Sequence, residues 1–193
     1  MANNTALDKN IIDDHKLVGR LYEHFLSTKD NTERQKVANT IIRELVKHSV
    51  GEEMVLYPLC EKHLGSEGTH VAEESRREHK MIEKMLYELD GMRVTDAGYA
   101  SKFEEVMREL RKHNEEEETD LLPKLRNVVK ENEWFHASGD FEKYKSTAPT
   151  RPHPSAPASG SMAQAAAGVT AAGLDKIRDT NRDYVDVARF KEE

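Results

Sequence analysis

The sequence is poor in features that several classes of protein need. It has a single cysteine, Cys60, which excludes an intrachain disulfide and a four-cysteine zinc site. No run of about 18 apolar residues is present, and this excludes a membrane-spanning helix. The net charge of −7 has the opposite sign to that of a general nucleic-acid binder. The first residues lack the apolar core of a secretory signal, so we expect a cytoplasmic protein. We also expect a monomer with no nucleic-acid or membrane partner.

Strand signals are scarce too, and helical signals fill almost all of residues 5–145, within an expected domain of residues 1–145. Valine, isoleucine and aromatic residues are sparse, and they do not alternate with polar residues over the length of a strand. Gly91 and the glycines at 65 and 68 separate the helical patterns. The sequence therefore predicts an all-α, up-down four-helix bundle. The predicted helices span Asp8–Ser27, Thr32–His63, His70–Asp90 and Asp96–Lys130, with a shorter helix over Glu133–Tyr144.

The composition changes after Lys145. Residues 146–172 hold four of the six prolines and a stretch rich in Ser, Ala and Gly, which is typical of a linker or a loosely attached segment. Residues 174–190 predict a last helix, but its apolar content is thin, and we expect it to dock weakly or not at all. We therefore treat 146–193 as a C-terminal extension. The residues expected on or near one face of its helix are Leu174, Ile177, Tyr184 and Val187.

Each of the four long helices carries a histidine on its apolar stripe. A single histidine there is usually a core residue with one hydrogen bond, but the same substitution on four helices favours another explanation. Unpaired buried polar groups cost about 1–3 kcal/mol each, and buried carboxylates are rare without a partner or a metal. Metal coordination would satisfy all of them. The six inward-facing polar residues are His15, His48, Glu52, His79, His113 and Glu117.

The spacing within the second and fourth helices supports a shared metal site. His48 and Glu52 lie four residues apart, and so do His113 and Glu117. Residues four apart share a helix face, about 6 Å apart along the axis. Each of these helices can therefore give one nitrogen and one oxygen to the same cluster.

The pattern H…HxxxExxxxxP occurs twice, and its two histidines are 33 positions apart in the first copy and 34 in the second. Such a repeat predicts a pseudo-two-fold bundle with the site between its halves. The prolines of the pattern, Pro58 and Pro123, lie inside helical segments, and we expect each to kink or break its helix.

Four imidazoles and two carboxylates exceed what one tetrahedral zinc ion needs, and magnesium or calcium would not use four histidines. Mixed nitrogen and oxygen ligation fits two non-haem iron ions, or one iron and one manganese. If Glu52 and Glu117 bridge the two ions, about four of the twelve coordination positions stay open. These positions suit an oxo or hydroxo bridge, water, O2 or peroxide.

The segments Asp13-Asp14-His15, His48-x3-Glu52, Glu78-His79 and His113-x3-Glu117 resemble the hemerythrin HHE cation-binding domain over about residues 8–145. The resemblance implies a four-helix bundle in which these four histidines bind iron and the two glutamates bridge the ions. The segment Pro149–Pro157 is similar to the stretch found after this domain in many fungal and bacterial members.

The sequence departs from the oxygen-carrying members at one ligand position. Those members have five histidines, two of them one turn apart on the third helix. Here the positions one turn from His79 are Ser75 and Glu83. The fifth ligand is missing, or a carboxylate such as Glu83 replaces it. This difference favours oxidation or peroxide chemistry over reversible carriage of O2.

Ferritin-like diiron bundles, which use Glu-x-x-His, are the competing scaffold. The chain has Glu67-x2-His70 and Glu133-x2-His136, but neither lies on an apolar stripe, and we reject that interpretation. The histidines off the stripes are expected at the surface. They are His24, His63, His70, His136 and His153.

Four other residues have plainer interpretations. Tyr22 lies two turns from His15 and fits core packing better than hydrogen bonding to a bound oxygen species. Cys60 fits a small buried hydrophobe. Glu53 and Glu118 occupy equivalent places in the repeat and are candidates for accepting hydrogen bonds from the histidine rings.

Two functional hypotheses from different classes are consistent with these residues. The first is a non-haem diiron protein that binds O2 or hydrogen peroxide, and whether it has peroxidase, catalase or oxidase activity stays open. The second is a non-catalytic iron or oxygen sensor or store. A scaffold with a purely structural metal is a third interpretation. Because the six inward-facing residues lie before Lys145, we expect a chain ending there to fold and keep its metal.

Overall fold

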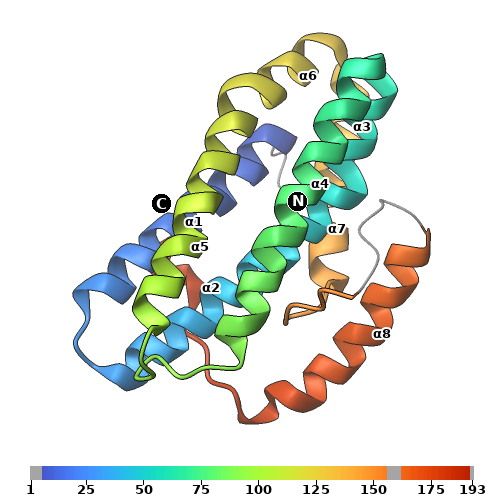
Figure 1. The fold of residues 1–193 in the computed structure, drawn as a ribbon. Helices are drawn as coiled ribbons and strands as arrows, with labels where there is room; N and C mark the ends of the chain where they lie inside the picture. The colour runs from blue at the N-terminus through green and yellow to red at the C-terminus, as the bar shows by residue number, and fades with distance from the viewer. Residues whose placement is uncertain (1–5, 156–161, 192–193) are drawn as a thin grey trace.

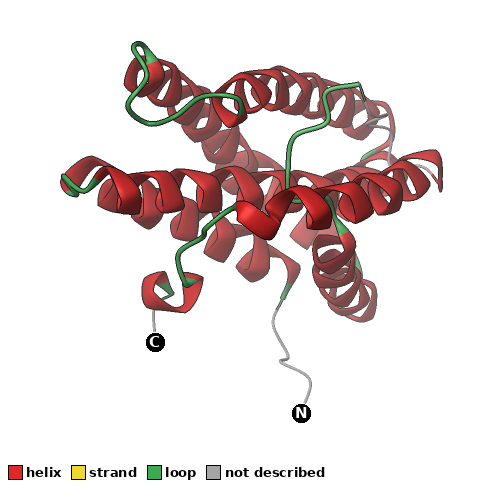
Figure 2. Cartoon of the chain, turned by 90° about the horizontal axis from the view of Figure 1, so that it is seen from below, coloured by secondary structure: helices red, strands yellow, loops and turns green. Residues whose placement is uncertain are grey.

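The computed structural model describes residues 6–155 and 162–191, and within them it contains helices and no strand (Figures 1 and 2). Long helical stretches joined by short turns form a bundle, which confirms the predicted all-α class. Over the described residues, no helix is long and apolar enough to cross a membrane. The α-helices are α1 (Leu7–Ser27), α2 (Asn31–Gly51), α3 (Tyr57–His63), α4 (Gly65–Asp90), α5 (Tyr99–Glu116), α6 (Leu122–Val128), α7 (Glu131–Thr147) and α8 (Met162–Arg178).

Two π-helical segments, η1 (Glu52–Leu56) and η2 (Glu117–Leu121), join α2 to α3 and α5 to α6. In each, the N–H after the segment bonds to the carbonyl of the segment's first residue, five positions back. Pro58 and Pro123 lie in the first turns of α3 and α6. The regular α-helix is thus interrupted just before each proline, in line with the expected kink or break, although the chain stays helical through the π turn.

The turn between α3 and α4 is tighter than the sequence suggests. The predicted helix start at His70 is wrong, because α4 begins at Gly65, two residues after α3 ends. Gly65 has a φ of +59°, which glycine adopts without strain. A Cβ atom at Gly68 would lie 1.9 Å from the carbonyl oxygen of Cys60. These glycines therefore allow a close helix contact in place of a loop.

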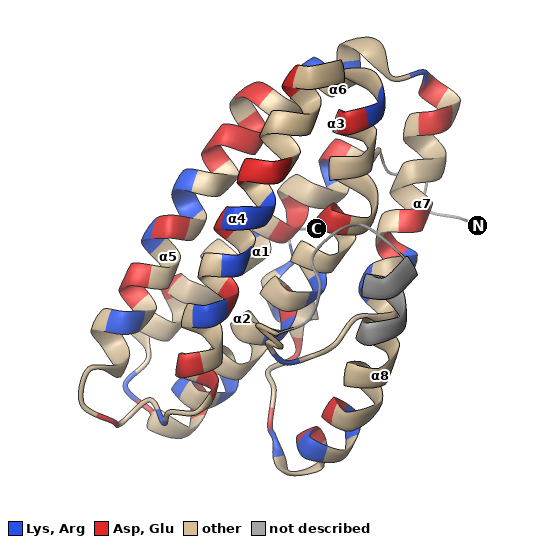
Figure 3. Cartoon of the chain, turned by 45° about the vertical axis from the view of Figure 1, so that its right-hand side comes forward, with Lys and Arg blue, Asp and Glu red and all other residues tan. Residues whose placement is uncertain are grey.

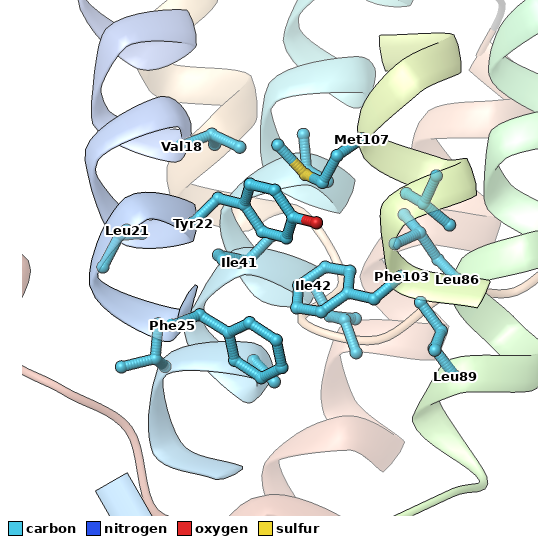
Figure 4. Close-up of a cluster of buried hydrophobic side chains, with 14 of the residues drawn as sticks. Val18, Leu21, Tyr22, Phe25, Ile41, Ile42, Leu86, Leu89, Phe103 and Met107 are labelled. Carbon is cyan, nitrogen blue, oxygen red and sulfur yellow. The ribbon is translucent and has the colours of Figure 1, made fainter. Parts of the chain in front are cut away.

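The buried apolar side chains form two clusters with a polar layer between them. On α1, Leu7 and Ile11 belong to one cluster, and Val18 and Phe25 belong to the other, part of which Figure 4 shows. His15 lies between the two sets. Charged residues recur along the outer turns of α4 and α5 (Figure 3). The helices therefore bury apolar stripes that are interrupted at one level by polar ligand candidates.

Tyr22 is part of the second apolar cluster, where its ring centroid lies 5.3 Å from that of Phe103 and 6.1 Å from that of Phe25. Figure 4 shows its ring among these side chains. The interpretation of Tyr22 as a core residue is therefore confirmed.

The predicted short helix over 133–144 is present as α7, which packs against α1, α2 and η1. Trp134 and Phe141 are its fully buried anchors. A Cβ atom at Gly51 would lie 2.6 Å from the Phe141 ring, so the glycine at the end of α2 lets α7 approach closely. The helix thus covers the bundle beside the polar layer.

The C-terminal extension docks more firmly than predicted. Val185 is 6% exposed in the apolar cluster, and its N–H donates to Thr40 Oγ1 at 3.0 Å. Arg151 and Arg182 both pair with Asp90 at the end of α4. These contacts show that polar anchors and one valine secure a segment whose overall apolar content is low.

Of the four residues expected on or near one face of the last helix, the two that lie on α8 pack loosely, as expected, whereas Val187 packs against the apolar cluster. Leu174 and Ile177 are 54% and 71% exposed. The expected helix over 174–190 is instead the end of α8 and, after it, two 3₁₀ turns, Asp179–Asn181 and Val187–Phe190. Much of α8 lies in the region expected to be a linker, because small residues such as alanine favour helix without requiring burial.

Candidate metal centre

The polar layer brings together all six residues predicted to face inward. The four histidines come from α1, α2, α4 and α5, in chain order, and the two glutamates are the first residues of η1 and η2. Each of the six is less than 10% exposed. They form two overlapping groups whose ligand atoms lie within 4.8 Å of one another. The first group is His15, His48, Glu52 and Glu117, and the second is Glu52, His79 and His113.

The four histidines form two pairs. The Nε2 atoms of His15 and His48 lie 3.0 Å apart, and those of His79 and His113 also lie 3.0 Å apart. Two nitrogens that are each about 2.1 Å from one ion, at right angles, lie about 3.0 Å from each other. The spacing within each pair therefore fits two ligands of a common metal ion.

Glu52 connects the two histidine pairs. Its Oε1 lies 2.9 Å from His48 Nε2, and its Oε2 lies 3.3 Å from His79 Nε2. The π turn η1 begins at this residue, and π turns inside α-helices frequently mark functional sites. One carboxylate thus offers an oxygen to each pair.

Glu117 repeats this arrangement from the other half of the bundle. Its Oε1 lies 3.4 Å from His113 Nε2, and its Oε2 lies 3.7 Å from His15 Nε2. It also begins a π turn, η2. The pseudo-two-fold repeat in the sequence therefore appears as two carboxylates that each span both histidine pairs.

The carboxylate oxygens are poorly satisfied by the protein alone. Both oxygens of Glu52 and Oε2 of Glu117 are buried and accept no hydrogen bond of good geometry. An unpaired carboxylate inside a protein is strongly unfavourable. Cations between the histidine pairs would satisfy these oxygens, so the residues fit a pair of metal ions.

The buried carboxylates of the cluster also favour positive charge on the groups around them. Burial lowers the pKa of His48 and His79, but the nearby carboxylates, led by Glu52, outweigh burial and raise both values to about 10. Burial and the charge of Glu52 raise the pKa of Glu117 to about 7. Without metal, protons on the imidazoles would supply the charge that cations can supply instead.

Every histidine of the cluster also binds a carboxylate through its other ring nitrogen. Glu118 Oε1 lies 2.7 Å from His15 Nδ1, and Glu53 Oε1 lies 3.2 Å from His79 Nδ1. The expectation that these two glutamates accept hydrogen bonds from the histidine rings is therefore confirmed. Such contacts fix the ring orientation and raise the basicity of the ligand nitrogen. The two glutamates each directly follow a candidate bridging glutamate in the sequence.

The corresponding partners of the other two histidines were missed by the sequence analysis. Asp14 Oδ2 lies 3.0 Å from His48 Nδ1, and Glu78 Oε2 lies 2.9 Å from His113 Nδ1. Both acidic residues directly precede a cluster histidine of their own helix, in Asp-His and Glu-His dipeptides. That repeated dipeptide is the signal that could have identified them.

A lysine holds each of these two missed carboxylates. Lys145 Nζ lies 2.5 Å from Asp14 Oδ2, and Lys112 Nζ lies 3.0 Å from Glu78 Oε1. The Lys145 side chain is 11% exposed, whereas that of Lys112 is 61% exposed. The two halves of the centre are therefore alike in chemistry but differ in access to water.

Tyr57 is a further residue that the sequence analysis missed. Its hydroxyl donates to Glu117 Oε1 at 3.1 Å and lies 2.9 Å from His79 Nε2. The side chain is fully buried. Burial and the neighbouring carboxylates, Glu117 first, raise the pKa of this phenol well above its usual value. Tyr57 therefore brings a protonated hydroxyl to the second histidine pair.

Glu83 does not take the place of the missing fifth histidine. Its Oε1 accepts the N–H of His153 at 3.0 Å, and it belongs to neither cluster group among the described residues. Ser75 is buried but offers no metal-binding group of the histidine, cysteine or carboxylate kind. Of the two alternatives, a missing fifth ligand or its replacement by a carboxylate, the structure argues against replacement by Glu83, since its side chain turns toward the C-terminal extension.

The rejected Glu-x-x-His alternative finds no support in the positions of its glutamates. Glu67 pairs with Lys124, and Glu133 pairs with Lys62 and His63. These contacts lie outside the six-residue cluster. The glutamates of that alternative therefore form ordinary ion pairs, which are partly exposed.

The fold and the cluster define a helical-bundle protein that can hold cations. The chain matches the family described as the Hemerythrin HHE cation binding domain over residues 6–125. It is 37% identical over 175 residues to an uncharacterized hemerythrin-like protein of Schizosaccharomyces pombe, covering 91% of this chain and 86% of that protein. No solved structure shows a match. The chain belongs to the hemerythrin HHE cation-binding domain family.

Proposed function

We propose that this protein is a non-haem diiron protein that binds and reacts with O2 or hydrogen peroxide. The observation that supports it most is the geometry of two histidine pairs, each with an Nε2 to Nε2 distance of 3.0 Å, spanned by two carboxylates. His15 and His48 would hold one ion, and His79 and His113 the other, with the glutamates shared between them. Iron in such a site supplies one-electron redox chemistry, and manganese is the alternative for one position.

The chain's own groups prepare this site for small, neutral oxidants. The two apolar clusters on either side of the polar layer exclude bulk water, which strengthens every electrostatic interaction within it. Glu52 and Glu117 give two negative charges that offset those of bound cations. The Nδ1 partners keep the four rings in place, so the ligand set is preorganised.

Tyr57 gives the second histidine pair a group that the first lacks. Its hydroxyl, buried beside His79 and Glu117, keeps its proton, which it donates to Glu117 in this structure and would turn toward a small oxygen molecule bound in the site. A positioned proton donor typically contributes about 10²–10⁴-fold to a reaction that it assists. Together with the missing fifth histidine, this donor favours reaction over reversible O2 carriage.

Metal analysis and optical spectroscopy test the proposal. After anaerobic reconstitution with iron, we expect two metal ions per chain, rapid oxidation in air and measurable turnover of hydrogen peroxide. A single ion per chain, or a preference for zinc, would overturn the diiron assignment. Reversal to the colourless reduced state under vacuum, over several cycles, would identify a carrier. Two bound irons without any reaction would favour the alternative of a sensor or store.

His48→Ala provides the matching genetic test. It removes one nitrogen of the first pair, so we expect the loss of at least one metal ion and a lower melting temperature for the metal-loaded protein. His24→Ala is the control, because His24 pairs with Glu33 and lies outside the cluster. Full metal content in His48→Ala would remove His48 from the ligand set.

A further inference from the structure

A cavity of about 170 Å³ lies between the bundle and the C-terminal extension. In Figure 1 the segment that leads from α7 toward α8, in orange, lies between α8 and the bundle. The bundle side of the cavity is formed by α2, η1 and α4, and the other side by the end of α7, the residues that follow it, and Gly168 and Val169 of α8. Its apolar walls include Val46, Val50, Ile82, Leu86, Pro149 and Val169.

The cavity reaches the candidate metal centre. His79 and its Nδ1 partner Glu53 are both part of its lining. His79 is 5% exposed, and its other ring nitrogen faces His113 inside the cluster. A molecule in the cavity would therefore touch the outer side of a candidate metal ligand while staying outside the ligand set.

The charged groups around the cavity already form ion pairs or hydrogen bonds within the protein. Arg151 pairs with Asp90, and the ring of His153 lies 3.0 Å from Asp175 Oδ1. Glu83 accepts the N–H of His153 at 3.0 Å. An ionic guest would have to lose its hydration without gaining a free counter-charge, so the cavity suits an uncharged guest.

The outer wall is fixed in place by a buried carboxylate. Asp175 is fully buried, and its Oδ2 accepts the N–H groups of Thr150 and Arg151 at 3.0 and 3.1 Å. The ring of His153 lies beside the same carboxylate. These bonds connect α8 to the segment after α7. The same segment is fixed to the bundle by the Arg151–Asp90 ion pair and by the N–H of His153, which donates to Glu83, so its position over the cavity is set from both sides.

We propose that this cavity is a binding site for a small, uncharged, apolar molecule of about the size of a single aromatic ring. Protein interiors contain few voids, and an apolar cavity of about 150 Å³ is known to stay dry and to bind benzene. The volume, the apolar walls and the neutralised charges agree on this class of ligand. The inference goes beyond the diiron proposal and does not rest on it.

The test uses the full-length, metal-free protein and toluene as the probe. We expect saturable binding in a nuclear magnetic resonance titration, with a Kd of about 1 mM or tighter and shifts at the methyl groups of Ile82 and Met54. Benzoate and benzylammonium have the same ring but carry a charge. We expect them to bind at least about tenfold more weakly. Equal binding of a charged probe, or no saturable binding of toluene, would overturn the proposal.

Two variants fill the cavity from opposite walls. Val50→Phe does so from α2, and Val169→Phe does so from α8, where the 64% exposed side chain tolerates a larger group. Each should weaken toluene binding at least about tenfold. Val128→Phe on α6, away from the cavity, is the matched control and should bind as the parent does. If the Val50→Phe protein does not fold, toluene binding by the Val169→Phe protein is the deciding measurement. Unchanged binding in the folded filling variants would refute the site.

Discussion

At the scale of single residues, the two halves of the centre differ at one buried side chain. Tyr57 comes five positions after Glu52, and the position five after Glu117 is Leu122, which is also buried. The phenol of Tyr57 donates to Glu117, whereas leucine has nothing to donate. The repeat therefore gives similar ligands to both histidine pairs but gives a proton donor to only one. This asymmetry is a reason to expect that the two pairs have different tasks.

Tyr57→Phe should keep the metal but lower reactivity. The change removes one hydroxyl and leaves the ring that packs in the apolar cluster, so we expect two metal ions per chain and unchanged helicity. Loss of the proton donor should reduce peroxide turnover at least about tenfold. Tyr22→Phe is the control, because Tyr22 lies in the other apolar cluster. Equal effects of both changes would mean that the Tyr57 hydroxyl has no special place in the reaction.

The two lysines behind the carboxylate partners allow a second matched comparison. Lys145→Met leaves Asp14 without its cation in a nearly buried position, so we expect about a 10–100-fold loss of metal affinity. Lys112→Met should cost less than about threefold, because water readily replaces an exposed lysine beside Glu78. Competition with a chelator measures both. A Lys145→Met protein with parent affinity would show that Asp14 needs no support.

At the scale of the elements, helical periodicity was enough to identify the six inward residues, because side chains on one helix face recur at spacings of three and four. Residues that hydrogen-bond to a cluster histidine of another helix show no such regular spacing in the sequence. Asp14 adjoins His15 in sequence but contacts His48. Tyr57 was missed for another reason. In an α-helix a residue five positions after Glu52 points about 140° away from it. The π turn η1 changes that phase and brings the phenol toward the site.

The turn between α3 and α4 depends on glycine at residue 68, and substitution tests this. Gly68→Ala should destabilise the protein by about 2–3 kcal/mol, because the added Cβ would overlap the backbone carbonyl of Cys60. Gly19→Ala in α1 is the control. Nothing lies within 4 Å of its Cβ position, so alanine should stabilise by about 0.5–1 kcal/mol. Urea unfolding measures both. Similar stability of the two variants would show that α3 and α4 can move apart at little cost.

At the scale of the whole molecule, the C-terminal extension differs in composition from the segments that carry the site, yet it packs against the bundle that they form. All six candidate ligands lie on the segments from α1 to η2, which agrees with the extent of the family match. The extension contributes no candidate ligand among its described residues, yet it anchors itself on Asp90 and inserts Val185 into the core. Composition alone could not predict this docking. A few well-placed polar contacts and one buried side chain decide it, and these do not alter the average apolar content.

Removal of the extension should therefore cost stability but not metal. We expect a chain that ends at Thr147 to keep two metal ions per chain and to melt about 4–8 °C lower, because the contacts of Val185 and the Asp90 ion pairs are lost. Val185→Ala in the full chain should account for about 1–2 kcal/mol of the loss. Val169→Ala, at a 64% exposed position, should change stability by less than about 0.5 kcal/mol. Elemental analysis and calorimetry check these outcomes. Loss of one metal on truncation would show instead that the extension, through the wall beside His79, holds the second histidine pair in place.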